Sequence, residues 1–217
     1  MSKEVMQKIM DNKIIAIIRG IHSDQMVSLV SAIRSGGICC AEVTFDQSSE
    51  EAAKDTLVSI SRLTERFGND VCVGAGTVMS AEQVRLAAEA GARYIISPNV
   101  DGEVIKETKR LGLVSIPGAL TPTEVACAYD LGADIVKLFP AGILGPAYVK
   151  AIRAPLKHIP MTAVGSINAA NCLEFFKAGC CGIGVGGNLV SKKLVDECRF
   201  EEITSAAREY TEVIRNL

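Results

Sequence analysis

The feature that most constrains this chain is a regular alternation of short apolar runs with amphipathic helical segments. Apolar runs of this length, almost without polar residues, are typical of parallel strands that helices cover on their outer face. We therefore predict eight strands, at residues 14–19, 41–44, 72–76, 94–97, 113–117, 135–139, 161–164 and 182–185.

The helices between these runs have recognisable start and stop signals. S-A-E-Q at Ser80 predicts a capped helix over 80–90, and T-P-T-E at Thr121 places proline in the first turn of another. Two further helices are predicted over 23–35 and 168–178. Glycine follows three helices in EAGARYIIS, DLGADIVKLF and KAGCCGIGV, where a left-handed residue ends the helix before the next strand.

Eight strand–helix units in 217 residues indicate a (β/α)8 barrel, with residues 1–217 forming one domain. In that arrangement, residues 1–12 form a helix across the bottom of the barrel, and residues 200–217 close the ring of helices. The alternative is an open doubly wound sheet. The dinucleotide-binding glycine pattern typical of that fold is absent, because RGIHSD follows the first strand.

Composition narrows the function. A net charge of -2 argues against nucleic acid as the main partner, which requires a basic excess. No apolar run approaches the ~18 residues of a membrane span. The first residues, MSKEVMQKIMDNK, lack the apolar centre of a signal peptide, so we expect a cytoplasmic protein.

The cysteines and histidines do not form a metal-binding pattern. The chain has eight cysteines, two histidines (His22 and His158) and no C-x-x-C, so we expect neither a zinc site nor any other metal or cofactor. The cysteines are expected to be reduced thiols in a cytoplasmic chain. A catalytic Cys–His pair is disfavoured because neither histidine lies in an apolar, strand-like setting.

Lys137 is the most informative single residue, because it lies within the apolar run D-I-V-K-L-F-P. Burying an ammonium is costly and lowers its pKa, which frees the amine for Schiff-base formation. The alternatives are a structural ion pair inside the barrel or a lysine whose amine reaches solvent from an edge. Barrel enzymes place their active sites at the carboxyl ends of the strands, where Lys137 would lie.

Other polar residues are predicted at the same end of the barrel. Glu42, in A-E-V-T, is either a proton shuttle or a neutralising partner of Lys137 or Arg19. Arg19 ends the first strand and suits a carboxylate or phosphate, or else forms a salt bridge with Glu42. Thr77 supplies a hydroxyl directly after the third strand, although threonine is common in such turns.

Two glycine-rich loops follow the seventh and eighth strands, in V-G-S-I-N and V-G-G-N. Loops at these positions often bind phosphate through backbone N–H groups. We therefore predict an anion site at Gly165, Ser166, Gly186 and Gly187, the alternative being ordinary turn glycines.

Taken together, these segments resemble a known family of enzymes. I-I-A-I-I-R, A-E-V-T, V-G-A-G-T-V, I-I-S-P, I-P-G-A-L-T-P-T-E and I-V-K-L-F-P occur in the order and spacing of the bacterial class I aldolases that act on 2-keto-3-deoxy-6-phosphogluconate and 4-hydroxy-2-oxoglutarate. The resemblance extends from about residue 14 to 190. It implies a homotrimer of (β/α)8 barrels that uses no metal.

The resemblance also implies roles for individual residues. Lys137 stands at the position of the Schiff-base lysine, and Glu42 at that of the proton shuttle. Arg19, Thr77 and Pro98 stand at positions that line the substrate site. On this reading, Arg19 and Thr77 hold the pyruvyl carboxylate.

An apolar wall completes this expected site, formed by Pro98 and Phe139 beside the lysine. Three positions differ from the family pattern. Asp46 replaces an arginine that contacts the substrate anion in many members, Val164 replaces a threonine, and Gly187 replaces a serine of the phosphate loop. These differences change residues expected to bind the anionic group at the far end of the substrate. They affect the aldol chemistry less.

The expected activity is cleavage of a 2-keto-3-deoxy-6-phospho sugar acid to pyruvate and glyceraldehyde 3-phosphate. One alternative is an aldolase for a non-phosphorylated 4-hydroxy-2-oxo acid such as 4-hydroxy-2-oxoglutarate. Another is a different phosphate-binding barrel, an epimerase or a thiamine-phosphate synthase type. The last is a non-catalytic barrel that binds small anions.

Overall fold

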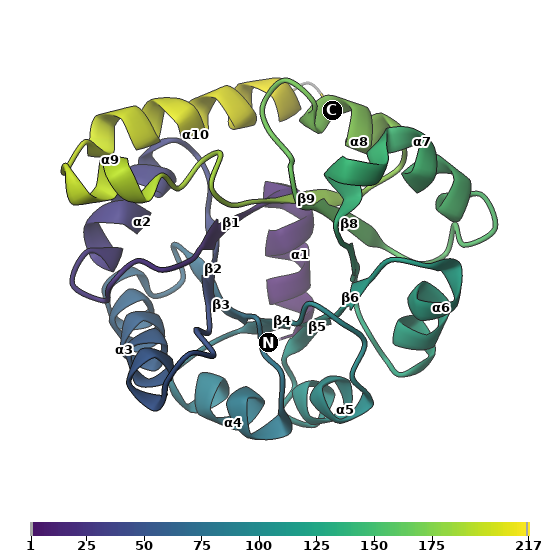
Figure 1. The fold of residues 1–217 in the computed structure, drawn as a ribbon, viewed down its shortest axis with the longest axis horizontal. Coiled ribbons are helices and arrows are strands. Elements are labelled where there is room, and N and C mark those ends of the chain that lie inside the picture. The colour runs from purple at the N-terminus through teal and green to yellow at the C-terminus, as the bar shows by residue number, and fades with distance from the viewer. Residues whose placement is uncertain (1, 216) are drawn as a thin grey trace.

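The structure is a computed structural model that describes residues 2–215 and 217. Parallel strands form a barrel, and helices surround it as an outer ring (Figure 1). The strands of the described residues are β1 (Ile14–Ile18), β2 (Cys40–Thr44), β3 (Cys72–Gly76), β4 (Tyr94–Ile96), β5 (Val114–Ile116), β6 (Gly118–Ala119), β7 (Val136–Leu138), β8 (Met161–Val164) and β9 (Gly182–Val185). The helices are α1 (Ser2–Asn12), α2 (Met26–Ser35), α3 (Glu50–Phe67), α4 (Ala81–Glu89), α5 (Gly102–Arg110), α6 (Pro122–Asp130), α7 (Ala141–Arg153), α8 (Cys172–Lys177), α9 (Lys192–Asp196) and α10 (Phe200–Ile214).

The barrel closes between β5 and β6, which are consecutive in the chain and lie at the two ends of the strand order. β5 lies within the strand predicted at 113–117 and β6 continues it, so together they count as one barrel strand and the (β/α)8 prediction is confirmed. Pro117 separates them because it has no N–H to continue a ladder. Across this junction, Asp134 N–H donates to the Ser115 carbonyl (3.0 Å) and Lys137 N–H to that of Pro117 (2.9 Å).

The prediction placed the end of this fifth strand at residue 117, whereas pairing with β7 continues through β6. Gly118 permits this continuation, since a Cβ at Gly118 would lie 2.3 Å from the Pro98 carbonyl oxygen. The other predicted strand ends agree with the structure to within one residue.

The structure confirms the predicted capping residues of two helices and the predicted glycines after three helices. Ser80 Oγ accepts from Gln83 N–H, and Thr121 forms a complete capping box with Glu124. The glycines that follow α4, α6 and α8 all have positive φ, as predicted; they are Gly91 (100°), Gly132 (104°) and Gly179 (103°).

Two predicted helix starts were too early. α2 begins at Met26 because residues 23–25 form a turn that a hydrogen bond from Gln25 N–H to His22 O closes. α8 begins at Cys172, not at Asn168. The side chains of Asn168 and Asn171 each accept from the other's backbone N–H, which holds residues 168–171 in a separate turn.

Helix α1 fills the bottom of the barrel, as predicted, and is visible behind its centre in Figure 1. Its Val5 and Ile9 are buried against a layer of inward-facing strand residues that includes Ile15, Tyr94 and Ile116. Burial of this apolar layer excludes water from that end. The interior is therefore accessible from the carboxyl ends of the strands.

Helix α10 closes the outer ring against α2, also as predicted. The two helices approach so closely at Gly36 that a Cβ there would lie 2.3 Å from the Ala207 Cβ. The hydroxyls of Thr204 and Thr211 donate to the carbonyls of Ala32 and Gly36 across the contact.

Two global properties bear on function. No described helix combines the length and apolar character needed to span a membrane. All eight cysteines are free thiols.

Candidate active site

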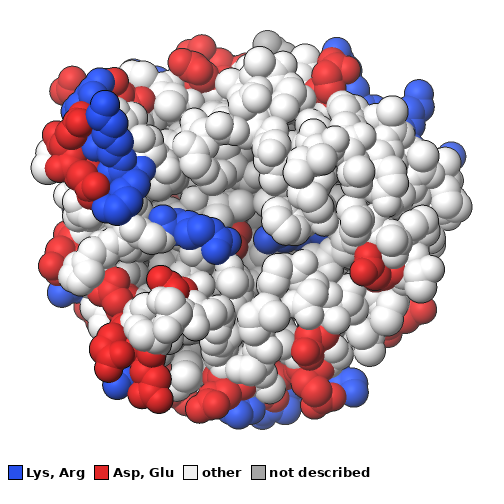
Figure 2. Space-filling model, viewed as in Figure 1, with Lys and Arg blue, Asp and Glu red and all other residues white. Residues whose placement is uncertain are grey.

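A pocket of about 460 Å³ lies at the carboxyl ends of the strands. Figure 2 shows a hollow at the centre of this face, with basic side chains beside it. Nine of the ten residues predicted for the site line this pocket: Arg19, Thr77, Pro98, Lys137, Phe139, Gly165, Ser166, Gly186 and Gly187. The tenth, Glu42, lies buried on β2.

Lys137 lies on β7, between Gly118 on one neighbouring strand and Thr162 on the other. Its side chain is in the barrel interior and only 7% of the residue is exposed. The ammonium nitrogen is 5.1 Å from the centroid of the Phe139 ring. Burial lowers the pKa of Lys137; the negative charge of Glu42 opposes this shift and the positive charge of Arg19 adds to it.

Glu42 is even more deeply buried, with 1% of the residue exposed. Its Oε2 has no hydrogen-bond partner among the described residues. Burial therefore raises the pKa of Glu42, while the positive charges of Lys137 and Arg19 act in the opposite direction. These two buried groups influence each other electrostatically without forming an ion pair within the described chain.

Gly76 provides the space for this carboxylate. An added Cβ at Gly76 would lie 1.7 Å from Oε1 of Glu42, so any other residue here displaces the glutamate. We did not identify this role from the sequence. The G-A-G before Thr77 was a visible signal, but only the fold shows which side chain the glycine accommodates.

Arg19 and Thr77 contact each other at the mouth of the pocket, where the guanidinium donates to Thr77 Oγ1 (3.2 Å). The Arg19–Glu42 salt bridge that we considered is not present among the described residues. Thr77 has a φ of 54°, a strained conformation for a non-glycine residue that is often found at functional sites.

Two glutamines hold the loop that carries Thr77, and neither was predicted as a site residue from the sequence. The Gln47 amide donates to the Thr77 carbonyl (2.8 Å), and Gln83 donates to Oε1 of Gln47 (2.9 Å). Gln83 also accepts from Met79 N–H (2.8 Å), which joins the loops after β2 and β3. No local pattern distinguishes such glutamines from surface residues.

The glycine loops after β8 and β9 present a group of free donors to the pocket. Across residues 2–215, the backbone N–H groups of Ser166, Ile167, Gly187 and Asn188 donate to no acceptor. Asn188, another residue that we missed, donates its side-chain amide to the Ile167 carbonyl (2.8 Å) and so joins the two loops. Free N–H groups on two loops that line one pocket favour an anion.

Two of the three residues that differ from the family pattern line this pocket, and the third lines a hollow beside it. Val164 and Gly187 line the pocket directly. Asp46 instead lines an adjoining hollow that shares Arg19 and Thr77 with it. Its carboxylate accepts from the backbone N–H of Ser48 (2.8 Å), and its pKa is lowered chiefly by hydrogen bonds from Ser48.

No group of three or more His, Cys, Asp or Glu side chains suited to a metal ion occurs in the part of the chain that the structure describes. The pocket and its surroundings combine one buried amine, one buried carboxylate and a set of free backbone N–H donors. This combination suits covalent chemistry on the carbonyl of a small acid.

Comparison with known proteins identifies the family of this chain. Residues 5–206 match the family described as KDPG and KHG aldolase, where KDPG is 2-keto-3-deoxy-6-phosphogluconate and KHG is 4-hydroxy-2-oxoglutarate. This chain belongs to that aldolase family. It is consequently a lyase, and family membership sets aside the epimerase, thiamine-phosphate synthase and non-catalytic alternatives.

Individual relatives cover nearly the whole chain. The 2-dehydro-3-deoxy-6-phosphogalactonate aldolase of Escherichia coli K12 is 32% identical over 93% of this chain and 96% of its own. The 2-dehydro-3-deoxy-phosphogluconate aldolase of Haemophilus influenzae is 28% identical over 99% and 98%. A solved structure described as native KDPGal has a TM-score of 0.83, with 32% identity and 94% of each chain covered.

The two buried charges are expected to destabilise the fold. Glu42 has a raised pKa, so stability is lost as the pH rises above its unfolded pKa. Lys137 has a lowered pKa, so stability is lost as the pH falls below its unfolded pKa. At pH 7, therefore, both groups lower the stability of the fold.

We predict that the double variant Glu42→Gln/Lys137→Met is more stable than the native chain at pH 7, by about 1–3 kcal/mol in urea unfolding. The matched surface variant Glu50→Gln/Lys54→Met should leave stability within about 0.5 kcal/mol. A double variant less stable than the native chain would contradict the assigned pKa directions.

Proposed function

We propose that this chain is a class I aldolase that cleaves a 2-keto-3-deoxy-6-phospho sugar acid, of the 2-keto-3-deoxy-6-phosphogluconate kind, to pyruvate and glyceraldehyde 3-phosphate. The observation that carries the proposal is the buried Lys137, whose lowered pKa favours a free amine within a pocket of anion-binding groups. No metal ion or organic cofactor takes part in the proposed steps.

Lys137 begins the reaction by attacking the 2-keto carbon of the substrate through its free amine. The carbinolamine loses water, and an iminium forms between Nζ and C2. This positively charged group accepts electrons from the neighbouring C3–C4 bond. Phe139, whose ring is 5.1 Å from the amine, and Pro98 form an apolar wall beside it, and burial lowers the pKa of Lys137, which favours the free amine needed for the attack.

Glu42 acts as the proton shuttle in the proposed cleavage. As a carboxylate, it takes the proton of the C4 hydroxyl, through a water molecule if one intervenes. The C3–C4 bond breaks, the aldehyde leaves, and the bonding pair forms an enamine. Glu42 returns the proton to C3, and water then hydrolyses the iminium to release pyruvate. A raised pKa suits a group that both accepts and donates a proton.

The two ends of the substrate would bind to different parts of the pocket. Arg19 and Thr77, in mutual contact at the mouth, bind the carboxylate of the pyruvyl part. The phosphate binds the loop residues Gly165, Ser166, Gly186 and Gly187 and the free N–H groups of these two loops. This separation supports a substrate with an anion at each end.

The names of the relatives support a phosphorylated substrate without fixing its stereochemistry. Phosphogluconate and phosphogalactonate derivatives of this kind are epimers at C4, and both give the same products. The alternative, a non-phosphorylated 4-hydroxy-2-oxo acid such as 4-hydroxy-2-oxoglutarate, is favoured by Asp46 and Gly187, which replace residues expected to bind the distal anion. The free N–H donors are the stronger observation because backbone N–H groups on these two loops can bind a phosphate directly.

Pyruvate with sodium borohydride tests the covalent step. Borohydride reduces the iminium to a stable amine, so we expect a mass increase on Lys137 in peptide mass spectra. Glu42→Gln should still be trapped, but its turnover should fall roughly 10²–10⁴-fold. Trapping on another lysine, or full turnover by Glu42→Gln, would rule out the assigned roles.

A substrate panel tests the phosphate site. We expect kcat/KM to be at least about tenfold higher for the phosphorylated acids than for the same acids without phosphate, because charge-assisted contacts are lost. Asn188→Ala, which frees the two loops from each other, should reduce this preference while leaving pyruvate trapping intact. Equal kcat/KM for both kinds of acid would favour the non-phosphorylated alternative.

We further propose that the chain forms a homotrimer in the cytoplasm, where its eight free thiols remain reduced. An apolar patch supports the assembly. It consists of Leu120, Phe139, Ile143 and Leu144, all exposed, with Ile143 exposed by 73%. The hydroxyl of Tyr148 donates to the Leu120 carbonyl (2.7 Å) and connects the two segments that carry the patch. Patches of this kind mark interfaces.

Sedimentation analysis tests the assembly. We expect the native chain to sediment as a trimer and Ile143→Glu to sediment mainly as a monomer, since burying an unpaired charge is costly. Val58→Glu is the matched control, because Val58 is an exposed apolar residue on α3 and should tolerate the charge. A trimer that survives Ile143→Glu would place the interface elsewhere.

A further inference from the structure

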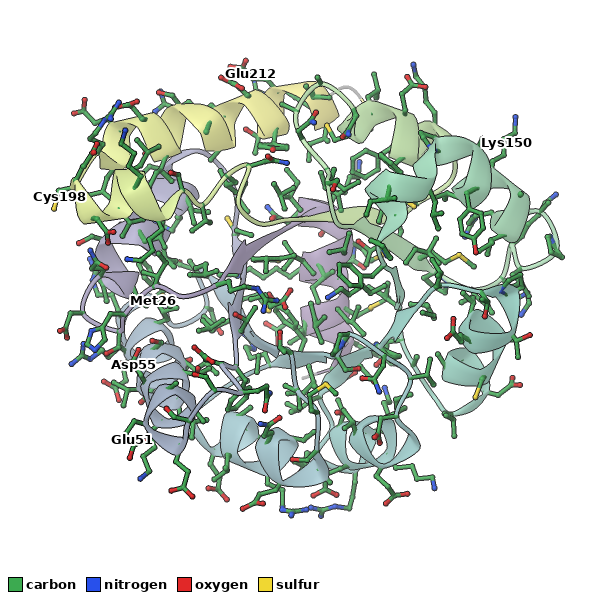
Figure 3. All side chains as sticks on the ribbon, viewed as in Figure 1. Met26, Glu51, Asp55, Lys150, Cys198 and Glu212 are labelled. Atoms are coloured by element: carbon green, nitrogen blue, oxygen red, sulfur yellow. The ribbon has the colours of Figure 1, made fainter. Side chains whose placement is uncertain are left out.

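A second hollow, of about 380 Å³, lies outside the barrel between its first two strands and the helices α2 and α3. It shares no lining residue with the proposed catalytic pocket. Figure 3 shows Met26 on α2 and Glu51 and Asp55 on α3 along the same side of the molecule. None of the steps of the aldolase reaction uses this hollow.

Ser59 is an unsatisfied polar group in the wall of this hollow. Only 1% of the residue is exposed, and its hydroxyl has no hydrogen-bond partner among the described residues. Its buried neighbour Thr56, in contrast, donates to the carbonyls of Thr44 and Ala52. A buried hydroxyl without a partner costs free energy, so Ser59 is suited to bind a polar group that enters the hollow.

The charges around the hollow are mainly negative. Asp46, Glu51 and Asp55 line it, and neither lysine nor arginine does. Asp55 accepts from Ser23 N–H (3.1 Å) and lies 3.4 Å from His22 Nε2. Glu51 forms no hydrogen bond or ion pair through its side chain within the described residues. A positive charge at this rim would therefore be stabilised.

The spacing on α3 relates these groups to one another. Glu51, Asp55 and Ser59 follow each other at intervals of four residues, which places them on one face of the helix. Each interval corresponds to about 6 Å along the axis. Ile21 and Met26, both buried, provide an apolar surface in the same hollow.

From these observations we infer that this hollow binds a small aliphatic amino alcohol. The ammonium group contacts Glu51 and Asp55, the methylene chain packs against Ile21 and Met26, and the hydroxyl pairs with Ser59. A neutral hydroxyl suits the buried end because a second ammonium there would lack a carboxylate partner. The described residues include no group of three His, Cys, Asp or Glu side chains that fits a metal ion.

Calorimetric titration of the full chain with 4-aminobutan-1-ol tests the inference. This probe carries an ammonium and a hydroxyl at a separation close to one helical interval of four residues. We expect one saturable site at low ionic strength. Butan-1-ol lacks the charge and 4-hydroxybutyrate reverses it, so neither should bind there.

Matched variants on α3 locate the site. Glu51→Gln should weaken binding about tenfold or more, since it removes a charge-assisted contact. Glu50→Gln removes the same charge from the neighbouring position, which does not line the hollow, and should bind as the native chain does. Ser59→Ala should weaken binding about fivefold, whereas Ser61→Ala should not.

Three results would overturn the inference. They are the absence of saturable binding, equal binding of 4-hydroxybutyrate, and binding that Glu51→Gln and Ser59→Ala leave unchanged. Pyruvate trapping on Lys137 provides an independent readout of the proposed aldolase function. If 4-aminobutan-1-ol does not bind but pyruvate is still trapped on Lys137, only the inferred amino-alcohol site is contradicted.

Discussion

The proposed chemistry depends on the burial of one amine and one carboxylate inside a barrel whose interior is largely apolar. Lys137 and Glu42 lie close enough to influence each other's pKa, yet neither neutralises the other through an ion pair. Such an arrangement is costly and persists only where the surroundings enforce it. Helix α1 seals the bottom, the β5–β6 junction closes the wall, and Gly76 leaves space for the carboxylate.

The mouth of the barrel favours negatively charged ligands, whereas the outer side of β1 and β2 favours positively charged ones. Arg19 and the free N–H groups after β8 and β9 favour anions at the mouth. On the outer side of β1 and β2, Asp46, Glu51 and Asp55 favour a cation. One small chain thus presents two hollows of different charge preference, one at the mouth of the barrel and one on the outer side of β1 and β2.

Much of this architecture could be predicted from the sequence, because it depends on local patterns. Apolar runs fixed the strands to within a residue at most ends, and Gly91, Gly132 and Gly179 marked helix ends where positive φ was required. Lys137 was recognisable because a charged residue stands within an apolar strand. Gly76, Gln47 and Asn188 were missed because their roles depend on partners from other loops or strands. The late start of α8 likewise reflects the reciprocal bonds of Asn168 and Asn171.

We propose that burial keeps the Lys137 amine available as a nucleophile. The most direct measurement is the ionisation of that one side chain, followed by NMR of lysine labelled with carbon-13 at Cε, with Lys137→Met used for assignment. We expect the Lys137 signal to titrate at clearly lower pH than the signals of the surface lysines, because burial lowers its pKa. Titration together with the surface lysines would contradict this proposal.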